Sequence, residues 1–418
     1  MIATVRSTSR LDGAIKAPGD KSISHRALIL GSMASGESHV RGLSAGADVQ
    51  STATCMRALG ADIEDSKIIG SGMRGLRQAK AALDCGNSGT TMRLLAGLLA
   101  AQPFESELIG DESLSRRPMD RVAGPLRDMG AGAAWPPLRV GGKTPLHAIE
   151  YKAQVPSAQV KSAILLAGLY AEGKTAVVEP VKTRDHTEVM LGAMGADVTV
   201  EGLRIEVGPT DMLQPIDISV PADFSAAAFW LAAAGLVAKS EVRLLGVGVN
   251  PTRTAFADTL VSIGYRIKRA NPHFEAGEPV ADLEVGPTEL LRAIRLNGNT
   301  AAEMIDELPV LAVVATQLPG TSMISGAGEL RVKESDRIAA MEEGLTAMGA
   351  DIVAQEDGWV INGPRYLEGA RVDPRGDHRV AMALAVAAMI ASGKTEIEGA
   401  ECVDISYPGF FDHLEYLA

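Results

Sequence analysis

The chain has 418 residues, of which 52 are acidic and 40 are basic, so its formal net charge at neutral pH is −12. Nucleic acids and anionic membranes select basic surfaces, and this charge balance therefore argues against both as partners. Hydrophobic residues make up 46% of the chain and aromatic residues 4%, which predicts a largely aliphatic core. At about 150 residues a domain, the length predicts two or three domains.

Three further features indicate a soluble, cytoplasmic protein. The longest apolar run, residues 225–238, is shorter than the roughly 20 residues that cross a bilayer. The first residues hold no apolar segment typical of a secretory signal. The three cysteines are few and lack metal-binding or redox-motif spacing, which fits a reducing compartment. We expect a monomer.

Six alanine- and leucine-rich helices are predicted, each opening on a glycine, proline or aspartate signal, at residues 19–30, 86–99, 156–169, 222–236, 306–318 and 376–390. The first turn of a helix has unpaired backbone N–H groups and the positive end of the helix dipole. Such starts favour a multiply charged anion when cations lie beside them. The candidate cations are Lys21, Arg26, Arg93, Lys161 and Arg379. We therefore expect a local cationic site on an otherwise acidic protein.

A second set of helices ends in a shared phrase, LGAD, MGAG or MGAD, at Leu59–Asp62, Met129–Gly132, Met194–Asp197 and Met348–Asp351. The helix that ends near Gly264 is a weaker copy, and residues 410–418 resemble a truncated sixth helix. A short alternating hairpin that ends in glycine follows most of these helices. The repeated unit is therefore expected to be β-α-β-α-β-β, counted cyclically, with a period of roughly 65–85 residues.

Six such units predict an α/β (α+β) fold of two pseudo-symmetric domains, each with three βαβαββ units, around an interdomain cleft. The helices at 225–236 and 380–390 are apolar nearly all round, which predicts that they are buried. Turn residues at 13–18 and 220–223 mark where the chain is expected to cross between domains. The expected domains are a discontinuous lower one, residues 1–14 and 221–418, and an upper one, residues 15–220.

The sequence GSGMRG at residues 70–75 matches a dinucleotide-binding pattern. It lies at the end of a predicted hairpin, where other units have VGG, VGP or NGP, and no clear βαβ unit or suitably placed acidic residue follows it. We therefore interpret it as a turn and expect no cofactor. His25, His186 and His378 do not have metal-binding spacing, so no metal is expected either.

Residues 19–26, GDKSISHR, suit a phosphate or carboxylate clamp. Gly19 and Asp20 predict a turn, Ser22 can cap the helix, and Lys21 and Arg26 project within about one turn of each other. The alternative is an ordinary capped helix with solvated charges.

Residues 86–93, GNSGTTMR, follow the same logic with more exposed backbone. Two glycines allow close approach, Asn87 and Ser88 offer caps, and Thr90 adds a hydroxyl near the amide groups. A glycine-rich loop selected for tight packing is the alternative.

The segment LRVKESDRI, residues 330–338, is expected to be helical. Lys333 and Arg337 are four residues apart and would share one helix face, with Glu334 beside them. The alternative is a surface ladder of ion pairs. The functional hypothesis is a general acid/base, Glu334, held among anion-binding cations.

Aspartates precede two of the apolar helices. Asp306 occupies a predicted N-cap position, and capping alone would explain it. Asp377 precedes Arg379, an arginine that enters an apolar helix and therefore needs a partner or a ligand. Arg117 and Arg184 fall in polar turns where site-facing loops are expected, although single basic turns are usually solvated.

Seven of these motifs together resemble those of the 5-enolpyruvylshikimate-3-phosphate synthase family, the 3-phosphoshikimate 1-carboxyvinyltransferases. They are GDKSISHR, GNSGTTMR, RRPM, PSAQVK, DELPVLA, VKESDR and GDHRVAMAL, which follow one another in the family's order, and the resemblance runs from about Gly13 to Pro408. The family's fold has two domains of three βαβαββ units, which agrees with the repeat count. The resemblance implies transfer of enolpyruvyl from phosphoenolpyruvate to the 5-hydroxyl of shikimate 3-phosphate with release of phosphate, by addition and elimination. The step belongs to the shikimate pathway, which leads through chorismate to aromatic amino acids.

The resemblance also implies site residues, carried over motif by motif. The residues implied to bind shikimate 3-phosphate are Lys21, Ser22, Arg26, Ser157, Ala158, Gln159, Arg184, Asp306 and Lys333. The residues implied to bind phosphoenolpyruvate are Lys21, Asn87, Gly89, Thr90, Arg117, Gln159, Arg337 and Arg379. Asp306 resembles the base for the 5-hydroxyl, and Glu334 the group that protonates the enol methylene and later removes that proton. Lys21 and Lys333 complete the implied catalytic set by stabilising charge.

The chain departs from the family at one position. Many relatives carry a lysine shortly before the aromatic-proline pair near the C-terminus, where Ile405 stands in this chain. The sequences RDHTE, SAQVK and NPTR resemble the branch that tolerates glyphosate, whereas Gly89 stands where some tolerant relatives have alanine. Partial tolerance is the resulting hypothesis.

Two other functions are weighed against this one. A UDP-N-acetylglucosamine 1-carboxyvinyltransferase would share the fold and the chemistry but typically relies on a loop cysteine, a context that none of the three cysteines has. A non-catalytic phosphometabolite-binding protein would need the cations but neither Asp306 nor Glu334.

Overall fold

The computed structural model describes residues 1–142, 144–286, 288–289 and 292–418. The chain forms two compact units. The split unit comprises Met1–Pro18, Pro221–His273 and Pro279–Ala418, and the inserted unit comprises Gly19–Val220 with Phe274–Glu278. None of the helices in the described ranges is long and apolar enough to cross a membrane.

The inserted unit holds three four-stranded sheets in its described residues, with strand orders β14-β3-β5-β4, β6-β7-β9-β8 and β10-β11-β13-β12. Its strands are β3 (Ser35–Arg41), β4 (Asp62–Glu64), β5 (Lys67–Ser71), β6 (Leu83–Asp84), β7 (Glu105–Ile109), β8 (Gly132–Ala134), β9 (Leu138–Gly141), β10 (Glu150–Lys152), β11 (Thr175–Val178), β12 (Val198–Glu201), β13 (Arg204–Val207) and β14 (Asp217–Ser219). Its helices are α1 (Lys21–Met33), α2 (Ala47–Ala58), α3 (Gly89–Leu99), α4 (Glu112–Ser115), α5 (Asp120–Asp128), α6 (Ala158–Gly168) and α7 (His186–Ala193).

The split unit, over its described residues, has sheets of order β16-β17-β15-β2, β18-β19-β21-β20 and β1-β23-β22. Its strands are β1 (Ile2–Arg6), β2 (Asp12–Ile15), β15 (Glu241–Gly248), β16 (Ile267–Glu275), β17 (Glu278–Val285), β18 (Arg295–Leu296), β19 (Gly320–Ile324), β20 (Asp351–Gln355), β21 (Gly358–Gly363), β22 (Arg371–Val372) and β23 (Lys394–Glu398). Its helices are α8 (Phe224–Leu236), α9 (Ala255–Ser262), α10 (Gly298–Glu303), α11 (Leu308–Ala315), α12 (Arg337–Ala347), α13 (His378–Ile390) and α14 (Phe410–Leu417), with 3-10 helices at Gly328–Val332 and Ala400–Ile405.

The four-stranded sheets share one arrangement, which confirms the predicted βαβαββ unit. In the sheet of α3 and α5, for example, β6 is parallel to β7, and β7 is antiparallel to β9, the second strand of the β8–β9 hairpin. The parallel step needs a crossover helix, and the hairpin needs only a short turn. The GSGMRG sequence lies at the end of β5 and in the turn after it, as predicted. Two of the predicted hairpins include residues 143, 287 and 290, which lie outside the described residues.

The chain closes each unit with strands that are distant in sequence. Strand β2, near the N-terminus, pairs in parallel with β15, and β14 pairs in parallel with β3. In the sheet that contains β22 and β23, β1 pairs antiparallel to β23, with Ile2 opposite Glu398. The strand nearest the start of the chain thus joins the sheet of the last repeated unit.

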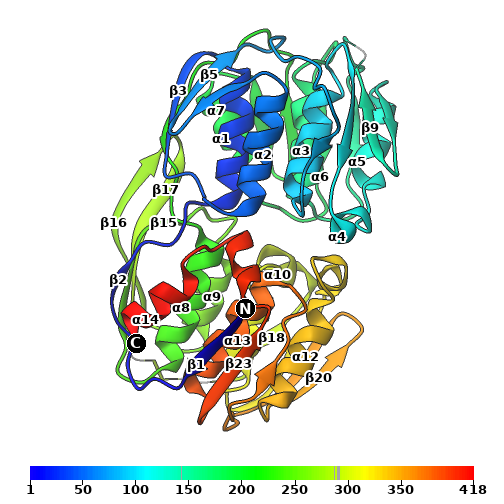
Figure 1. Cartoon of the computed structure of the whole chain (residues 1–418). Coiled ribbons are helices and arrows are strands. Elements are labelled where there is room, and N and C mark those ends of the chain that lie inside the picture. The colour runs from blue at the N-terminus through cyan, green and yellow to red at the C-terminus, as the bar shows by residue number, and fades with distance from the viewer. Residues whose placement is uncertain (143, 287, 290–291) are drawn as a thin grey trace. The chain divides into compact units, whose positions relative to one another are not determined.

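The first helix of each repeated unit forms the core. Every residue of α11 is buried, and α8 and α13 are buried over nearly their whole length, which confirms the prediction for apolar helices. In the inserted unit α1, α3 and α6 are buried in the same way, and Figure 1 shows α1, α2, α3 and α6 grouped beside one another. Because these helices are internal, their N-terminal turns, rather than a lateral face, are what each unit can offer to a ligand.

Candidate functional site

The N-terminal turns of the inserted unit are closed by short polar caps. Asp20 caps α1 and accepts a hydrogen bond from Ile23 N at 2.9 Å, so the prediction of Ser22 as the cap is wrong. Ser88 caps α3 and Ser157 caps α6, each by accepting from the backbone three residues on. Each cap satisfies one donor and leaves other first-turn N–H groups for a ligand.

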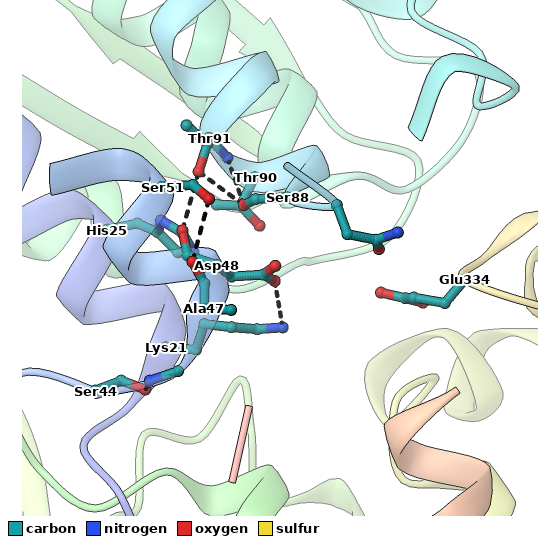
Figure 2. A network of polar contacts seen from close by, with 12 residues as sticks. Lys21, His25, Ser44, Ala47, Asp48, Ser51, Ser88, Thr90, Thr91 and Glu334 are labelled. Atoms are coloured by element: carbon teal, nitrogen blue, oxygen red, sulfur yellow. Dashed lines mark hydrogen bonds and ion pairs between the residues drawn. The ribbon is translucent and has the colours of Figure 1, made fainter. Parts of the chain in front are cut away.

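Lys21, in the first turn of α1, is paired with Asp48 of α2. The Lys21 Nζ to Asp48 Oδ2 distance is 2.9 Å, and the two side chains are 15% and 8% exposed. Figure 2 shows this pair beside Thr91, whose hydroxyl contacts both the Asp48 carbonyl and the Ser88 hydroxyl. The cap of α3 and the partner of Lys21 therefore belong to one hydrogen-bonded network.

His25 fixes the interior of this network. Its Nδ1 lies 2.6 Å from the hydroxyl of Thr52, which in turn lies 2.7 Å from the hydroxyl of Thr91. Burial, reinforced by the positive charges of Lys21 and Arg26, lowers the pKa of His25 well below its usual value. His25 is therefore neutral near pH 7, and its role is to hold the Thr52 hydroxyl in place rather than to supply charge.

A second group of side chains gathers over the start of α3. Arg117 donates from Nη2 to Asn87 Oδ1 at 2.6 Å, and Asn87 donates to Asp111 at 2.6 Å. Gln159, in the first turn of α6, donates to the Thr90 hydroxyl at 2.8 Å and accepts a short hydrogen bond from Arg93. The first turns of α3 and α6 thus share one polar surface.

The backbone of Gly89 lies close to two of these cations, Arg93 and Arg117. A Cβ at this position would lie 2.9 Å from Arg93 Nη1 and 3.4 Å from Arg117 Nη1. A side chain there could be accommodated only if a guanidinium moved. The glycine therefore keeps both guanidinium groups close to the backbone N–H groups of α3.

Arg26 is buried and is held by neutral oxygens. Its guanidinium donates to the hydroxyls of Thr187 at 2.6 Å and Ser162 at 2.7 Å, and to the Ser22 carbonyl at 2.9 Å. Burial lowers its pKa to about 10, although the charge of Glu188 opposes this shift. These bonds use three of its five N–H donors, so the described residues leave two for a ligand.

Arg184 and the α6 residues flank Arg26. Arg184 lies in the segment before α7 and is partly exposed. Burial is the main cause that lowers the pKa of Arg26, and the positive charge of Arg184 adds to it, whereas the nearby carboxylates raise that pKa. Ser157 and Ala158 are also partly exposed. The inserted unit thus presents cations and capped helix starts, which is a surface for anions.

The split unit gathers its candidate residues around Asp306. Asp306 Oδ1 lies 3.9 Å from Lys333 Nζ and 3.4 Å from Arg337 Nη1, and Asp306 Oδ2 lies 3.7 Å from Arg379 Nη2. Arg379 also donates to the Asp306 carbonyl at 3.1 Å. Three cations from three different segments therefore converge on one carboxylate.

Arg337 is the centre of this cluster, with a side chain only 1% exposed. It donates to Glu334 Oε2 at 2.7 Å and to Asp377 Oδ2 at 2.8 Å. Burial alone would lower the pKa of Arg337, but Asp377, Glu334 and Asp306 outweigh it and raise the pKa above its ordinary value. Arg337 is therefore permanently charged, as an anion-binding residue must be.

The local structure corrects two predictions in this unit. Asp306 lies in the turn between α10 and α11, and Glu307 occupies the N-cap position of α11. Lys333 is not helical, because the 3-10 helix ends at Val332 and α12 begins only at Arg337. Asp336 caps α12 by accepting from Ala339 N at 3.1 Å. Lys333 and Arg337 share a target, Asp306, without sharing a helix face.

Several partners of the site residues cannot be recognised in the sequence. Asp48, Asp111 and the pairing of Asp377 with Arg337 have no local signal, because each partner lies far away in sequence. Arg93, a candidate cation that is not among the implied site residues, bonds to Gln159 in the structure. Lys161, predicted to bind anions, is buried between two glutamates instead.

Two other expectations concern a metal ion and the lysine that many relatives carry near the C-terminus. Among the described residues no set of three or more His, Cys, Asp or Glu side chains is placed to hold a metal ion. Ile405, which stands where many relatives have lysine, is the last residue of the 3-10 helix Ala400–Ile405 and is half-buried.

Comparison with known proteins gives a consistent result. The family model described as EPSP synthase (3-phosphoshikimate 1-carboxyvinyltransferase) matches residues 5–414. The chain is 48% identical to the 3-phosphoshikimate 1-carboxyvinyltransferase of Geobacillus kaustophilus, with 98% of each chain covered. It is 49% identical to that of Gloeobacter violaceus, with 97% of this chain and 96% of the relative covered.

Solved structures agree with the sequence comparison. The EPSP synthase of Acinetobacter baumannii superposes with a TM-score of 0.89 at 40% identity, covering 100% of this chain and 98% of the other. The enolpyruvyl transferase NikO of Streptomyces tendae has a TM-score of 0.81 at 18% identity, with 100% and 97% covered, and so shares the fold. The predicted mixed α/β fold of repeated small sheets is confirmed.

Proposed function

The chain belongs to the EPSP synthase (3-phosphoshikimate 1-carboxyvinyltransferase) family and transfers the enolpyruvyl group of phosphoenolpyruvate to shikimate 3-phosphate, and we propose that its active site draws on both cation clusters. The reaction is a step of the shikimate pathway of aromatic amino acid biosynthesis.

Both substrates are multiply anionic and repel each other. Holding their reacting atoms about 3 Å apart therefore requires fixed positive charge and helix dipoles on more than one side. The fixed cations of the inserted unit and the three cations around Asp306 supply such an environment.

Shikimate 3-phosphate is assigned to the start of α6 and to the segments around it. Its phosphate would accept from the α6 N-terminal turn (Ser157, Ala158), from Gln159 and from Arg184. Arg26 has donors left for the same ligand, and Lys21 and Ser22 lie one turn before it. Asp306 and Lys333 would reach the 5-hydroxyl side.

Phosphoenolpyruvate is assigned to the cations that surround the start of α3 and to those of the split unit. Lys21, Asn87, Gly89 and Thr90 line the first of these surfaces with Arg117 and Gln159, and Arg337 and Arg379 belong to the second. Arg337 already holds a carboxylate, Glu334, at 2.7 Å. An incoming carboxylate or phosphate would compete for that guanidinium and free Glu334 for proton transfer.

Asp306 is the proposed base for the first step. It removes the proton from the 5-hydroxyl as that oxygen attacks C2 of phosphoenolpyruvate, while Glu334 delivers a proton to C3. The product of this addition is a tetrahedral intermediate with a methyl group. Lys21 and Lys333 stabilise the charge that develops on the phosphate and on the attacking oxygen.

The second step reverses the proton flow at carbon. Glu334 removes a proton from the methyl group, the C2–C3 double bond re-forms, and the bond from C2 to the phosphate oxygen breaks. Phosphate then leaves with both electrons of that bond and takes up the proton that Asp306 removed in the first step, which restores the Asp306 carboxylate. One carboxylate thus acts first as acid and then as base.

The observation that best supports this proposal is the convergence of Lys333, Arg337 and Arg379 on Asp306, with Glu334 on the same arginine. A binding protein would need the cations but not the two carboxylates. The test is a coupled phosphate-release assay with phosphoenolpyruvate and either acceptor. Release is expected with shikimate 3-phosphate and not with UDP-N-acetylglucosamine, and the reverse pattern would reject the assignment.

Replacing Gly89 with alanine is expected to weaken phosphoenolpyruvate binding selectively. The added Cβ would lie 2.9 Å from Arg93 Nη1 and would force that guanidinium aside. We expect KM for phosphoenolpyruvate to rise about 10-fold and KM for shikimate 3-phosphate to change less than about twofold. Gly124→Ala in α5, where a Cβ meets no atom within 4 Å, is the matched control. Equal effects on both KM values would show that Gly89 does not face phosphoenolpyruvate.

Partial tolerance to glyphosate is a further part of the proposal. The sequences RDHTE, SAQVK and NPTR support it, whereas the open position at Gly89 limits it. Glyphosate is expected to compete with phosphoenolpyruvate only weakly. Competitive inhibition in the nanomolar to low micromolar range would rule tolerance out.

We also propose a monomeric, cytoplasmic enzyme that uses no cofactor. The three cysteines are free thiols, as expected in a reducing compartment, and the reaction needs only acid, base and positive charge. Light scattering of the purified protein is expected to give the mass of one chain. A mass of two chains at micromolar concentration would contradict this part of the proposal.

A further inference from the structure

The inserted unit holds a buried ion cluster that the reaction scheme does not use. Lys161 of α6 is 2% exposed, and its Nζ lies 2.9 Å from Glu179 Oε2 and 2.7 Å from Glu188 Oε1. Glu179 directly follows β11, and Glu188 lies in the first turn of α7. A single ammonium group therefore joins a helix, the end of a strand and the start of another helix.

The segment between the two glutamates carries Arg184. Near its beginning, the carboxylate of Glu179 also accepts hydrogen bonds from the hydroxyl and the backbone N–H of Thr183. At its end, Glu188 is bound to the same ammonium as Glu179. Arg184 thus lies between Thr183, which is bonded to Glu179, and Glu188, and both glutamates are bound to Lys161.

Lys161 belongs at the same time to the first turns of α6. Its backbone N–H bonds to the carbonyl of Ser157, the N-cap residue, at 3.0 Å. The residue after it, Ser162, and the residue before Glu188, Thr187, bond to each other at 2.7 Å and both accept from Arg26. The Lys161 cluster is therefore next to three residues assigned to shikimate 3-phosphate, namely Ser157, Arg26 and Arg184.

The charges of the cluster are balanced only when Lys161 is present. Burial raises the pKa of Glu188, and Lys161 opposes that shift. The charge of Glu188 in turn opposes the lowered pKa of Arg26. Two buried cations thus offset two buried carboxylates, and removing one cation leaves a charge that the protein interior does not tolerate.

We propose that Lys161 is a positioning residue for shikimate 3-phosphate: by holding Glu179 and Glu188 together, it fixes Arg184 against the capped start of α6. The inference rests on the proposed assignment of Ser157 and Arg184 to that substrate. Lys161 itself does not touch the ligand, because both of its carboxylate partners lie within 3 Å.

The test is steady-state kinetics of Lys161→Met with both substrates varied. KM for shikimate 3-phosphate is expected to rise about 10-fold or more, while KM for phosphoenolpyruvate stays within about threefold. A purely structural role would lower the fraction of active enzyme and the thermal midpoint without separating the two KM values. Equal changes in both KM values, or none, would overturn the proposal.

A second variant separates positioning from folding. In Lys161→Met with Glu188→Gln, one of the two carboxylates that lose their cation is removed, so the thermal midpoint is expected to recover part of the way towards that of the wild type. KM for shikimate 3-phosphate is expected to stay raised, because the tie across the segment is still missing. Recovery of both quantities would contradict the positioning role. The double variant carries the test if Lys161→Met does not fold.

The chain offers a matched control and a test of the premise. Lys174 also lies between two carboxylates, 3.2 Å from each of Asp197 and Glu206, but it is 53% exposed. Lys174→Met is expected to leave both KM values unchanged. Arg184→Ala tests the premise alone. If it leaves KM for shikimate 3-phosphate unchanged, the substrate assignment and the inference both fail; if it raises that KM and Lys161→Met does not, only the inference fails.

Discussion

Replacing Glu334 with glutamine is expected to lower kcat by about 100-fold or more, a loss of roughly 2.7 kcal/mol of transition-state stabilisation. Glutamine keeps the size of the side chain but can neither donate nor remove the proton at C3. Arg337 remains held by Asp377 at 2.8 Å and by Asp306 at 3.4 Å, so the cation stays in place. KM for phosphoenolpyruvate is therefore expected to stay level or to fall, since one competitor for Arg337 is weakened.

The measurement is initial-rate kinetics with calorimetric binding of shikimate 3-phosphate to the same variant. Glu343→Gln is the matched control, because Glu343 pairs with Arg375 on the exposed surface of the same unit. That control is expected to keep wild-type rates. Full turnover in Glu334→Gln would remove Glu334 from the proton-transfer steps.

Asp306→Asn is expected to lower kcat by about 100-fold or more for a different reason. The amide cannot accept the proton of the 5-hydroxyl, so the attacking oxygen must lose its proton to water or to a poorer base. The Asp306 carbonyl still accepts from Arg379 at 3.1 Å, which keeps that backbone segment in place. Lys333, Arg337 and Arg379 keep their charges, and the affinity for phosphoenolpyruvate is expected to be equal or higher.

Asp351→Asn provides the control for this variant. Asp351 pairs with Arg365 at 2.6 Å in the same unit, on a largely exposed surface, and its loss is expected to leave turnover intact. Binding of both substrates is measured beside kcat. If Asp306→Asn abolishes binding together with turnover, Asp306 organises the cations and is not the base.

The repeated architecture could be predicted because its signals are local. Apolar helices, capped starts and hairpin turns recur along the chain, and the caps Ser88, Ser157 and Asp377 follow from residue type and position alone. The completion of the last sheet by β1 was not predicted. Its pairing joins residues at opposite ends of the chain, and no sequence pattern specifies which free strand edge they meet.

Helix starts were predicted less well than helices. In residues 330–338 the spacing of Lys333 and Arg337 suggested one helix, but Asp336 is the N-cap and α12 begins only after it, at Arg337. At Asp306 the helix starts two residues later, where Pro309 fits the first turn because it needs no N–H partner. Small shifts of this kind decide whether a side chain caps its own helix or faces a ligand.

The local pair of Glu334 with Arg337 could be predicted, but partners that lie far apart in sequence could not. Lys161 and Lys21 are both lysines near the start of an apolar helix, yet Lys161 is enclosed by two glutamates and Lys21 meets one aspartate at the edge of the unit. The difference depends on which helices pack together. A single sequence does not record that packing, so cations that bind ligand and cations that hold the fold look alike in it.

The most direct test of the account is a crystal structure of the Glu334→Gln variant with shikimate 3-phosphate and phosphoenolpyruvate bound. We expect one bound shikimate 3-phosphate to contact Ser157 and Arg184 with its phosphate and Asp306 with its 5-hydroxyl, and phosphoenolpyruvate to contact Arg117 and Arg337 together. Shikimate 3-phosphate bound away from Ser157, Arg184 and Asp306, or phosphoenolpyruvate bound away from Arg117 and Arg337, would contradict the proposed active site.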